Sequence, residues 1–312
     1  MKVLFMGTPD YAAVTLEKLI ASEHELLGVV TQPDKQKGRG QELSFSPVKE
    51  LALKHGIPIY QPNKVREVDF LDMVRVMAPE VIVVAAFGQI LPKALLDIPP
   101  YGCINVHGSL LPKYRGAAPI QYSIIDGEGE TGITIMYMDA GIDTGDMILQ
   151  ARLPIAENET GGSLFDKMSH LGADLLLEAL DQLKAGTALR IPQDNEQATY
   201  VKVLSKDMGF LDFSQPAVKL ERMIRGLNPW PSAFTYLEGK TLKLWQASVE
   251  PLKDNSAKPG QVIELRKDSF VVATGDNALV IKELQLEGKK RMTTDAFLRG
   301  YQLAPGTILG QR

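Results

Sequence analysis

Cysteine and histidine are scarce in this sequence of 312 residues. A single cysteine, Cys103, excludes an internal disulfide framework and is typical of a protein from a reducing compartment. Because Cys103 lies in an apolar stretch with no basic residue beside it, we interpret it as a small buried hydrophobe and not as a nucleophile. The four histidines are scattered along the chain, so the sequence predicts no transition-metal site.

Two further patterns are missing. No stretch approaches the roughly 20 apolar residues that a membrane helix requires, and the N-terminus lacks the regions of a secretory signal. We therefore expect a cytoplasmic protein without a membrane partner. The turn after the first apolar stretch carries one glycine, Gly7, instead of the Gly-x-Gly-x-x-Gly pattern of dinucleotide-binding proteins. This absence argues against a nicotinamide-dependent oxidoreductase.

The net charge of −4 is unevenly distributed along the chain. Residues 204–312 contain 16 Lys and Arg against 12 Asp and Glu, whereas residues 1–203 contain 18 against 26. The C-terminal part is thus the relatively basic one. This asymmetry is compatible with a polyanionic partner such as RNA.

The N-terminal part alternates between predicted strands and helices. Residues 2–6 are predicted to form a strand, residues 11–21 an amphipathic helix and residues 26–31 the next strand, an order that predicts a parallel sheet. Residues 80–86 are almost entirely apolar, as expected of a strand that is buried on both faces. The expected fold class is therefore α/β, with a Rossmann-like, doubly wound parallel sheet.

The C-terminal part has a different pattern. Polar residues 192–197 are typical of a linker, and short predicted strands separated by glycine-containing turns follow between residues 233 and 284. We predict one domain over residues 1–189, a linker over residues 190–203 and a smaller domain with a β-barrel over residues 204–312.

The most informative stretch is residues 105–112, Asn-Val-His-Gly-Ser-Leu-Leu-Pro. Since side chains alternate along a strand, Asn105 and His107 are expected on one face of the strand that begins near residue 102. An amide can hydrogen-bond an oxygen as negative charge develops on it, and an imidazole can stabilise that charge or transfer a proton. The pair suits attack on a carbonyl group. Pro112 prevents a helix, which leaves residues 110–111 on a loop where they can line a pocket.

A second element, residues 139–145 with the sequence Asp-Ala-Gly-Ile-Asp-Thr-Gly, follows this stretch. With the two elements in register, the sequence resembles the 10-formyltetrahydrofolate-dependent formyltransferases over nearly its whole length. It resembles most the members that formylate methionine on initiator tRNA. The resemblance implies a Rossmann-like, folate-binding catalytic domain and an OB-like β-barrel in the C-terminal domain.

The resemblance also implies roles for single residues. The catalytic set would be Asn105, His107 and Asp143. The tetrahydrofolate-binding residues would come from three loops: Ser109, Leu110, Leu111, Pro112, Phe87, Gly88, Gln89, Ile90, Leu91 and Asp139. A carboxylate beside His107 would orient the ring or hold a water that relays protons. The spacing of the second element does not match an EF-hand loop, so no metal is predicted.

Residues 32–47 form a predicted loop that contains the cations Lys35, Lys37 and Arg39. Exposed cations on a flexible loop suit the binding of phosphates, although a merely solvated loop has the same composition. The segment resembles the tRNA-binding loop of the methionine-specific members, which implies that these three residues contact tRNA. The densest basic run consists of Lys289, Lys290 and Arg291. We interpret this run either as a solvated turn or as a further RNA contact.

We expect a monomer that transfers the formyl group of 10-formyltetrahydrofolate to the α-amino group of methionine on initiator tRNA. The alternatives within this class are transfer to an amino sugar nucleotide or to glycinamide ribonucleotide, and hydrolysis of the formyl donor by water. A small acceptor would leave the cationic loop nothing to bind, which favours tRNA. From another class, a non-catalytic, folate-responsive RNA binder would not require the Asn, His and Asp set.

Overall fold

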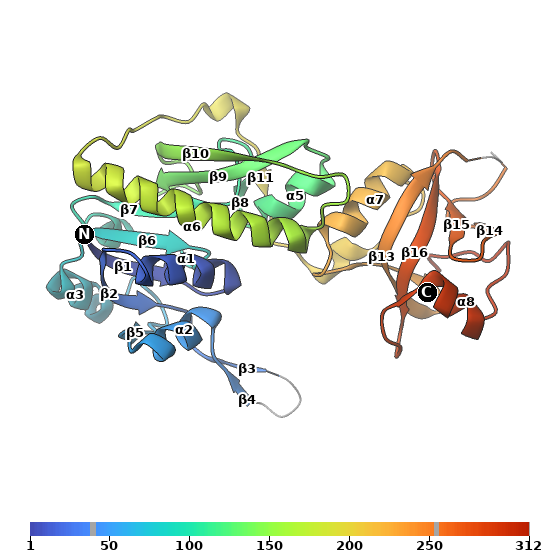
Figure 1. Ribbon diagram of the computed structural model, residues 1–312, viewed down its shortest axis with the longest axis horizontal. Coiled ribbons are helices and arrows are strands. Elements are labelled where there is room, and N and C mark those ends of the chain that lie inside the picture. Colours follow the sequence, from blue (N-terminus) through green and yellow to red (C-terminus); the bar gives the residue numbers. More distant parts are fainter. Residues whose placement is uncertain (38–41, 253–255, 312) are drawn as a thin grey trace. The chain divides into compact units, whose positions relative to one another are not determined.

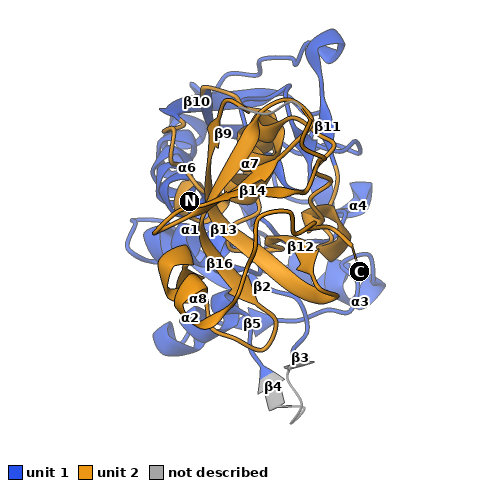
Figure 2. Cartoon of the chain, turned by 90° about the vertical axis from the view of Figure 1, so that its right-hand side faces the viewer, with its two compact units in different colours: residues 1–119, 130–154, 165–201 blue, residues 120–129, 155–164, 202–312 orange. Residues whose placement is uncertain are grey.

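The computed structural model describes residues 1–37, 42–252 and 256–311. The chain divides into two compact units, which Figure 2 shows in different colours. Unit 1 comprises residues 1–119, 130–154 and 165–201, and unit 2 comprises residues 120–129, 155–164 and 202–312. Two short segments of unit 2 are therefore inserted between parts of unit 1 in the sequence. In the part of the chain that is described, no helix is long and apolar enough to cross a membrane.

Unit 1 is built on a seven-stranded sheet with the order β10-β9-β7-β6-β1-β2-β5 (Figure 1). Its strands are β1 (Lys2–Gly7), β2 (Glu25–Val30), β5 (Ile59–Tyr60), β6 (Val81–Ala85), β7 (Cys103–His107), β9 (Glu130–Tyr137) and β10 (Met147–Pro154). The neighbouring pairs from β5 to β7 are parallel, which confirms the predicted Rossmann-like parallel sheet. Strands β9 and β10 extend it as an antiparallel edge.

Unit 1 contains several helices, and local sequence signals mark both ends of one of them, α2. The helices are α1 (Asp10–Ile20), α2 (Pro47–His55), α3 (Val68–Met77), α4 (Lys93–Leu96) and most of α6 (Gly161–Ala185), with α5 (Pro119–Ile125) beginning at its boundary. The Ser46 hydroxyl accepts a 3.1 Å hydrogen bond from the Lys49 backbone N–H, and Pro47 occupies the first turn of α2. Gly56, at φ 65°, ends the helix in the left-handed conformation that glycine adopts without strain.

The two faces of the sheet in unit 1 have different neighbours. A Cβ atom on Gly172 of α6 would lie 2.8 Å from the Val106 side chain and 3.1 Å from the Tyr11 hydroxyl, so α6 packs closely against that face. Cys103, two residues along the strand from Asn105, belongs instead to the core cluster that includes residues of α3 and α4. Asn105 and His107 therefore continue the face that α6 does not cover.

The segment between β2 and α2 contains a short hairpin. Strands β3 (Lys35–Lys37) and β4 (Glu42–Ser44) pair in antiparallel orientation, and Figure 1 shows them projecting away from the sheet of unit 1. The sequence predicted a loop over residues 32–47. That prediction was wrong for the paired residues, because pairing the two arms satisfies their backbone N–H and C=O groups.

A second small ladder in unit 1 joins residues that are far apart in the sequence. Strand β8 (Arg115–Gly116) pairs in parallel with β11 (Tyr200–Val201). The Arg115 backbone N–H donates to the Thr199 carbonyl at 2.8 Å, and the Tyr114 N–H donates to the Thr199 hydroxyl at 2.8 Å. A 3-10 helix, η1 (Asn195–Gln197), precedes β11. The last residues of unit 1 are thus fixed beside the loop that follows β7.

Unit 2 contains an antiparallel sheet with the order β12-β13-β16-β15-β14. The elements are η2 (Lys206–Gly209), α7 (Ala217–Gly226), β12 (Ala233–Leu237), β13 (Lys240–Glu250), β14 (Val262–Leu265), β15 (Phe270–Ala273), β16 (Ala278–Leu286), β17 (Met292–Thr293) and α8 (Thr294–Gly300). Strand β17 pairs with β16, and fully buried residues such as Leu244, Phe270 and Ile281 form the core. Among the described residues β12 and β14, the two ends of this sheet, do not pair with each other, so the sheet is open there.

Candidate active site

Asn105 and His107 lie at the carboxyl end of β7, in the middle of the sheet of unit 1. The strand order reverses at β1, which has β2 on one side and β6 on the other. Open α/β sheets bind ligands outside the carboxyl ends of the strands at such a point. The loops that follow β6 and β7, which contain residues 87–91 and 109–112, lie at this edge.

The imidazole of His107 is buried, with 5% of its surface exposed. Its Nε2 lies 3.0 Å from the Tyr114 carbonyl oxygen, and since a carbonyl only accepts hydrogen bonds, this nitrogen carries the hydrogen. Nδ1 faces Oδ2 of Asp143 at 3.7 Å, a separation too long for a hydrogen bond. Nδ1 is therefore the ring atom that can exchange a proton or approach a substrate.

Asp143 projects from the loop between β9 and β10. Its backbone lies in the left-handed region, at φ 53°, which costs free energy for any residue with a Cβ atom. Oδ2 accepts a 2.8 Å hydrogen bond from the Gly116 backbone N–H, whereas Oδ1 has no hydrogen-bond partner within the described part of the chain. The structure thus brings the predicted pair His107 and Asp143 together and leaves one carboxylate oxygen open.

The loop of Asp143 is held by a side chain that sequence reasoning missed. The side-chain amide nitrogen of Gln193 donates to the carbonyl oxygens of Asp143 and Gly145, at 2.8 Å each. The oxygen of the same amide accepts from the Arg115 guanidinium at 3.0 and 2.8 Å. Arg115 follows shortly after Pro112, but Gln193 lies in the polar segment that was predicted to be a linker. Only the structure, and not the sequence, reveals that these two side chains are in contact.

Asn105 differs from His107 and Asp143 because its side chain is uncommitted. The residue is partly exposed and lies on the same face of β7 as His107. Among the described residues no group hydrogen-bonds to its amide. An amide that is positioned by a strand and free of internal partners can donate to a bound oxygen atom.

The residues predicted to line the folate site after β7 have different environments. Ser109 is fully buried, and its hydroxyl donates to the Lys113 carbonyl at 2.6 Å. Leu111 is also buried, and its N–H donates to the Thr134 hydroxyl at 3.1 Å. Leu110 and Pro112 are partly exposed. Of the four, Leu110 and Pro112 therefore have the side chains with surface available to a ligand.

The loop after β6 is also fixed by glutamine side chains. Phe87 and Leu91 are buried in the core, whereas Ile90 is 81% exposed and Gly88 is exposed at φ 84°. The side-chain oxygen of Gln89 accepts from the Val65 N–H at 3.1 Å, and the Gln32 amide donates to the Phe87 carbonyl at 3.1 Å. Backbone and apolar groups of this loop are thus presented at the same edge as Asn105.

Asp139 lines a cavity of about 370 Å³ in unit 1. Its apolar walls include Leu96, Met138 and Ala140. The chain's one cysteine, Cys103, also lines it and lies on the same strand face as Asn105. Burial, with a smaller contribution from Asp97, raises the pKa of the Cys103 thiol to about 12. The thiol is therefore protonated near neutral pH and does not act as a nucleophile there. The cavity combines apolar walls with a few polar groups, as small-molecule sites do.

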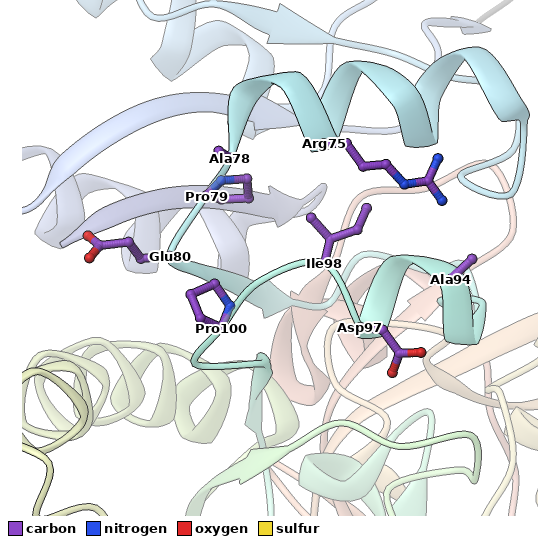
Figure 3. A pocket seen from close by; sticks show the side chains of 8 residues that line it. All are labelled: Arg75, Ala78, Pro79, Glu80, Ala94, Asp97, Ile98 and Pro100. Carbon is purple, nitrogen blue, oxygen red and sulfur yellow. The ribbon is translucent and has the colours of Figure 1, made fainter.

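A larger cavity in unit 1, of about 560 Å³, shares Asp97 with the first (Figure 3). It is lined by Arg75 of α3, by Asp97 and Ile98 after α4, and by Glu80, which directly precedes β6. The amino end of a parallel strand lies opposite to its carboxyl end, so this cavity is at the other edge of the sheet from Asn105 and His107. It includes none of the residues predicted to bind substrate.

The predicted tRNA-binding residues fall in two places. Lys35 and Lys37 lie in β3, and Arg39 lies outside the described residues. In unit 2, Lys289 and Lys290 are exposed in the turn between β16 and β17. Arg291 instead donates to both oxygens of Glu283, at 2.8 and 2.5 Å, and its guanidinium lies 4.8 Å from the ring of Trp245.

The described residues hold no group of three or more His, Cys, Asp or Glu side chains that could bind a metal ion. Asp143 and Asp139, the two carboxylates of the second motif, are occupied differently. Oδ1 of Asp139 accepts from the Gly141 N–H at 2.9 Å and from the Thr144 hydroxyl at 2.6 Å, which closes the start of the loop on itself.

Comparison with protein families places this site in a known group. A family model described as formyl transferase matches residues 1–180, and a model described as formyl transferase, C-terminal domain, matches residues 203–302. The chain belongs to the formyl transferase family. The amide and imidazole of β7 and the carboxylate of the following loop therefore lie in the part of the chain that the first model covers.

Curated relatives match this formyl transferase over its full length. It is 51% identical to the methionyl-tRNA formyltransferase of Lachnospira eligens, with 100% of each chain covered. It is 53% identical to that of Agathobacter rectalis, with 99% of each chain covered, and 50% identical to that of Clostridioides difficile, with 99% of this chain and 100% of the relative covered.

Solved structures share the fold at lower identity. A sugar 3N-formyl transferase, solved in the presence of dTDP and 5-N-formyl-THF, gives a TM-score of 0.66 at 20% identity over 93% of this chain and 99% of that one. HypX from Aquifex aeolicus, in complex with tetrahydrofolic acid, gives a TM-score of 0.64 at 18% identity over 96% of this chain and 47% of that one. These similarities support the fold of the formyl transferase chain.

Proposed function

We propose that this protein transfers the formyl group of 10-formyltetrahydrofolate to the α-amino group of methionine on initiator tRNA. The observation that carries the proposal is the identity of about half of all positions, over the full length, with relatives that are each named methionyl-tRNA formyltransferase. The site supports it because a free amide, a buried imidazole and a carboxylate meet at the ligand-binding edge of the sheet.

The residues fit a folate formyl donor. The free amide of Asn105 and the backbone groups of residues 87–91 can hydrogen-bond polar edges, while Leu96, Met138 and Ala140 provide apolar walls. Leu110 and Pro112 add partly exposed apolar surface on the other side of the strand end. This is the combination of apolar contact and a few polar groups that binds an aromatic, polar-edged molecule.

The reaction forms a bond between the amine nitrogen and the formyl carbon and breaks the bond from that carbon to folate N10. Asn105 donates its amide to the formyl oxygen as negative charge develops there. His107, with Nε2 committed to the Tyr114 carbonyl, supports the same charge through Nδ1 when the ring is protonated. The amine gives up one proton and N10 gains one. The open Oδ1 of Asp143 is placed to accept and return it, directly or through a water.

We propose that Lys289 and Lys290 contact tRNA, together with the hairpin that carries Lys35 and Lys37 and with Arg39. The two lysines of unit 2 are exposed, whereas the charge of Arg291 is paired with Glu283. Replacing both lysines by alanine should raise the KM for tRNA and lower the slope of log affinity against log salt by about 2. Arg291→Ala should lower that slope less. Equal effects would contradict the distinction between the lysines and Arg291.

We also propose three finer features of the protein. The antiparallel sheet of unit 2 is proposed to belong to the OB-like barrel class, on the basis of its β12-β13-β16-β15-β14 order and the resemblance. The protein is proposed to act as a monomer. It is proposed to do so in the cytoplasm, where charged initiator tRNA is found.

The test mixes the purified protein and 10-formyltetrahydrofolate with methionyl initiator tRNA, methionyl elongator tRNA or free amines, and follows the formylated product. Rapid formylation of the initiator alone is expected. Turnover on an amino sugar nucleotide, or release of formate without an amine, would overturn the acceptor and leave the site to be reassigned to that chemistry.

A further inference from the structure

Behind the proposed catalytic pair, a series of polar contacts connects Asp143 to a buried guanidinium. Gln193 donates to the carbonyls of Asp143 and Gly145, and its oxygen accepts two hydrogen bonds from Arg115. Each end of the glutamine amide is therefore saturated. One end holds the catalytic loop and the other is held by a cation.

Arg115 is 1% exposed, and its contacts are to neutral acceptors. Besides Gln193, these are the Asn195 side-chain oxygen at 2.8 Å and the Tyr200 hydroxyl at 3.0 Å. A buried cation polarises the acceptors around it, and hydrogen bonds in series strengthen one another in a low-dielectric environment. The positive charge on Arg115 therefore makes the Gln193 amide a better donor toward the loop of Asp143.

The same three-residue segment holds both members of the catalytic pair. The Tyr114 carbonyl accepts from His107, and the Gly116 N–H donates to Asp143. Arg115, between them, holds Gln193, which fixes the backbone of Asp143 from the opposite direction. The 3.7 Å separation of the imidazole and the carboxylate is therefore set by contacts that all meet at residues 114–116.

The loop needs this support because Asp143 is strained. Its φ of 53° is unfavourable for a residue with a Cβ atom, and such conformations persist only where surrounding contacts determine them. Without the two bonds from Gln193, the backbone can relax and turn the carboxylate away from His107. A displacement of about 1 Å at a reacting group can reduce the rate by about 10²-fold.

We propose that Gln193 and Arg115 are positioning residues that hold the carboxylate of Asp143 at its working distance from His107. This inference rests on the proposed function, since it assigns a role to the residues behind the same site. Gln193 acts through the loop and touches no substrate. Its loss should thus lower kcat and leave the KM values for both substrates nearly unchanged.

The decisive variant is Gln193→Glu. Its carboxylate keeps an acceptor for Arg115, now as an ion pair, but has no amide hydrogens. The bonds to the Asp143 and Gly145 carbonyls are therefore replaced by repulsion between oxygens. The kcat for formylation of methionyl initiator tRNA should fall about 10-fold or more, with each KM within about twofold of the parent. Gln197→Glu is the matched control, because Gln197 lies in the same segment and, within the described part of the chain, its side chain bonds only to Asp194. It should leave kcat unchanged.

A double-mutant cycle separates positioning from a general structural role. In the Asp143→Asn background, Gln193→Glu should cost less than about threefold, since the group that it positions is already impaired. Gln193→Met, which cannot bond to either partner, should give the same pattern if its melting temperature stays near that of the parent.

Two outcomes would overturn the inference: an unchanged kcat in Gln193→Glu, or a full-sized loss in the Asp143→Asn background. Failure of the proposed function looks different. In that case the parent protein does not formylate initiator tRNA, or Asp143→Asn by itself retains full activity.

Discussion

Asp143 in unit 1 and Asp276 in unit 2 make the same hydrogen bond in different surroundings. Each accepts from the backbone N–H of a distant residue, Gly116 at 2.8 Å and Ala217 at 2.9 Å. Asp276 also accepts from Asn277 and from the Thr274 hydroxyl, and these bonds lower its pKa, the bond from Ala217 having the largest effect. Asp143 keeps Oδ1 open among the described residues and faces an imidazole. The backbone hydrogen bond therefore anchors the structure in both cases. Asp143 alone of the two also has an open oxygen atom and an imidazole beside it, so it can still exchange a proton.

The largest expected effect comes from removing the charge of Asp143. Asp143→Asn keeps an oxygen that can accept from the Gly116 N–H but cannot accept a proton from the amine. We expect kcat to fall by about 10²-fold or more, in the range of general acid–base catalysis, with little change in melting temperature. Steady-state kinetics and thermal unfolding measure both. Asp146→Asn is the control, because that carboxylate lies just beyond the loop and forms an ion pair with Arg190, at 3.8 Å.

A second prediction displaces the Gly116 backbone N–H that donates to Asp143. Gly116 has φ 110°, and a Cβ atom there would lie 2.3 Å from the Val201 carbonyl oxygen. Gly116→Ala must therefore shift the backbone between β8 and β11, which should lower kcat about 10-fold and destabilise the fold by about 1–3 kcal/mol. Gly186→Ala has a similar positive φ with no atom in the way, so it should reduce stability less and leave kcat intact. Equal kcat values for the two variants would argue against the anchor.

A third prediction concerns the loop after β6. Gln89→Ala removes the acceptor of the Val65 N–H, a neutral hydrogen bond that contributes about 1 kcal/mol. If this loop binds the folate, the KM for 10-formyltetrahydrofolate should rise about fivefold while kcat changes little. Gln182→Ala, on the exposed side of α6, provides the comparison. A loss confined to kcat would place Gln89 with the catalytic pair instead.

The smallest effect on activity is expected at Asp276. Because its folded-state pKa lies below the ordinary 3.8, its charged form stabilises the protein above about that pH, and this contribution is lost as the pH falls through the folded-state value. Asp276→Asn should therefore lower the melting temperature near pH 6 and leave kcat unchanged. The difference in melting temperature from the parent should shrink as the pH drops below 3.8. A difference that is constant with pH would show that the charge of Asp276 contributes nothing.

Part of the site follows from local rules. The alternation of strand side chains predicts that Asn105 and His107 share a face, and the apolar run at residues 80–86 predicts the neighbouring buried strand. The five strands predicted between residues 233 and 284 correspond to β12–β16. These features depend on residues a few positions apart.

The support of Asp143 could not be predicted in the same way. Arg115 and Gln193 are 78 positions apart, and nothing in a polar segment such as residues 192–197 distinguishes a solvated linker from one that inserts a side chain beside the loop of Asp143. The β3–β4 hairpin was missed for a similar reason, because pairing between its arms overrides the loop-like composition. Long-range hydrogen bonds leave no periodicity in one sequence.

The positions of Gln193 and of the β8–β11 ladder also determine where the chain can be cut to obtain unit 1 as a fragment. The family model for the N-terminal domain ends at residue 180, and a chain cut there or at residue 189 would still carry Asn105, His107 and Asp143. It would lack Gln193, Thr199 and Tyr200, and with them the contacts to Asp143, Tyr114 and Arg115. A fragment that ends before Gln193 would thus retain Asn105, His107 and Asp143 and lose the groups that hold Asp143 and Tyr114 in place.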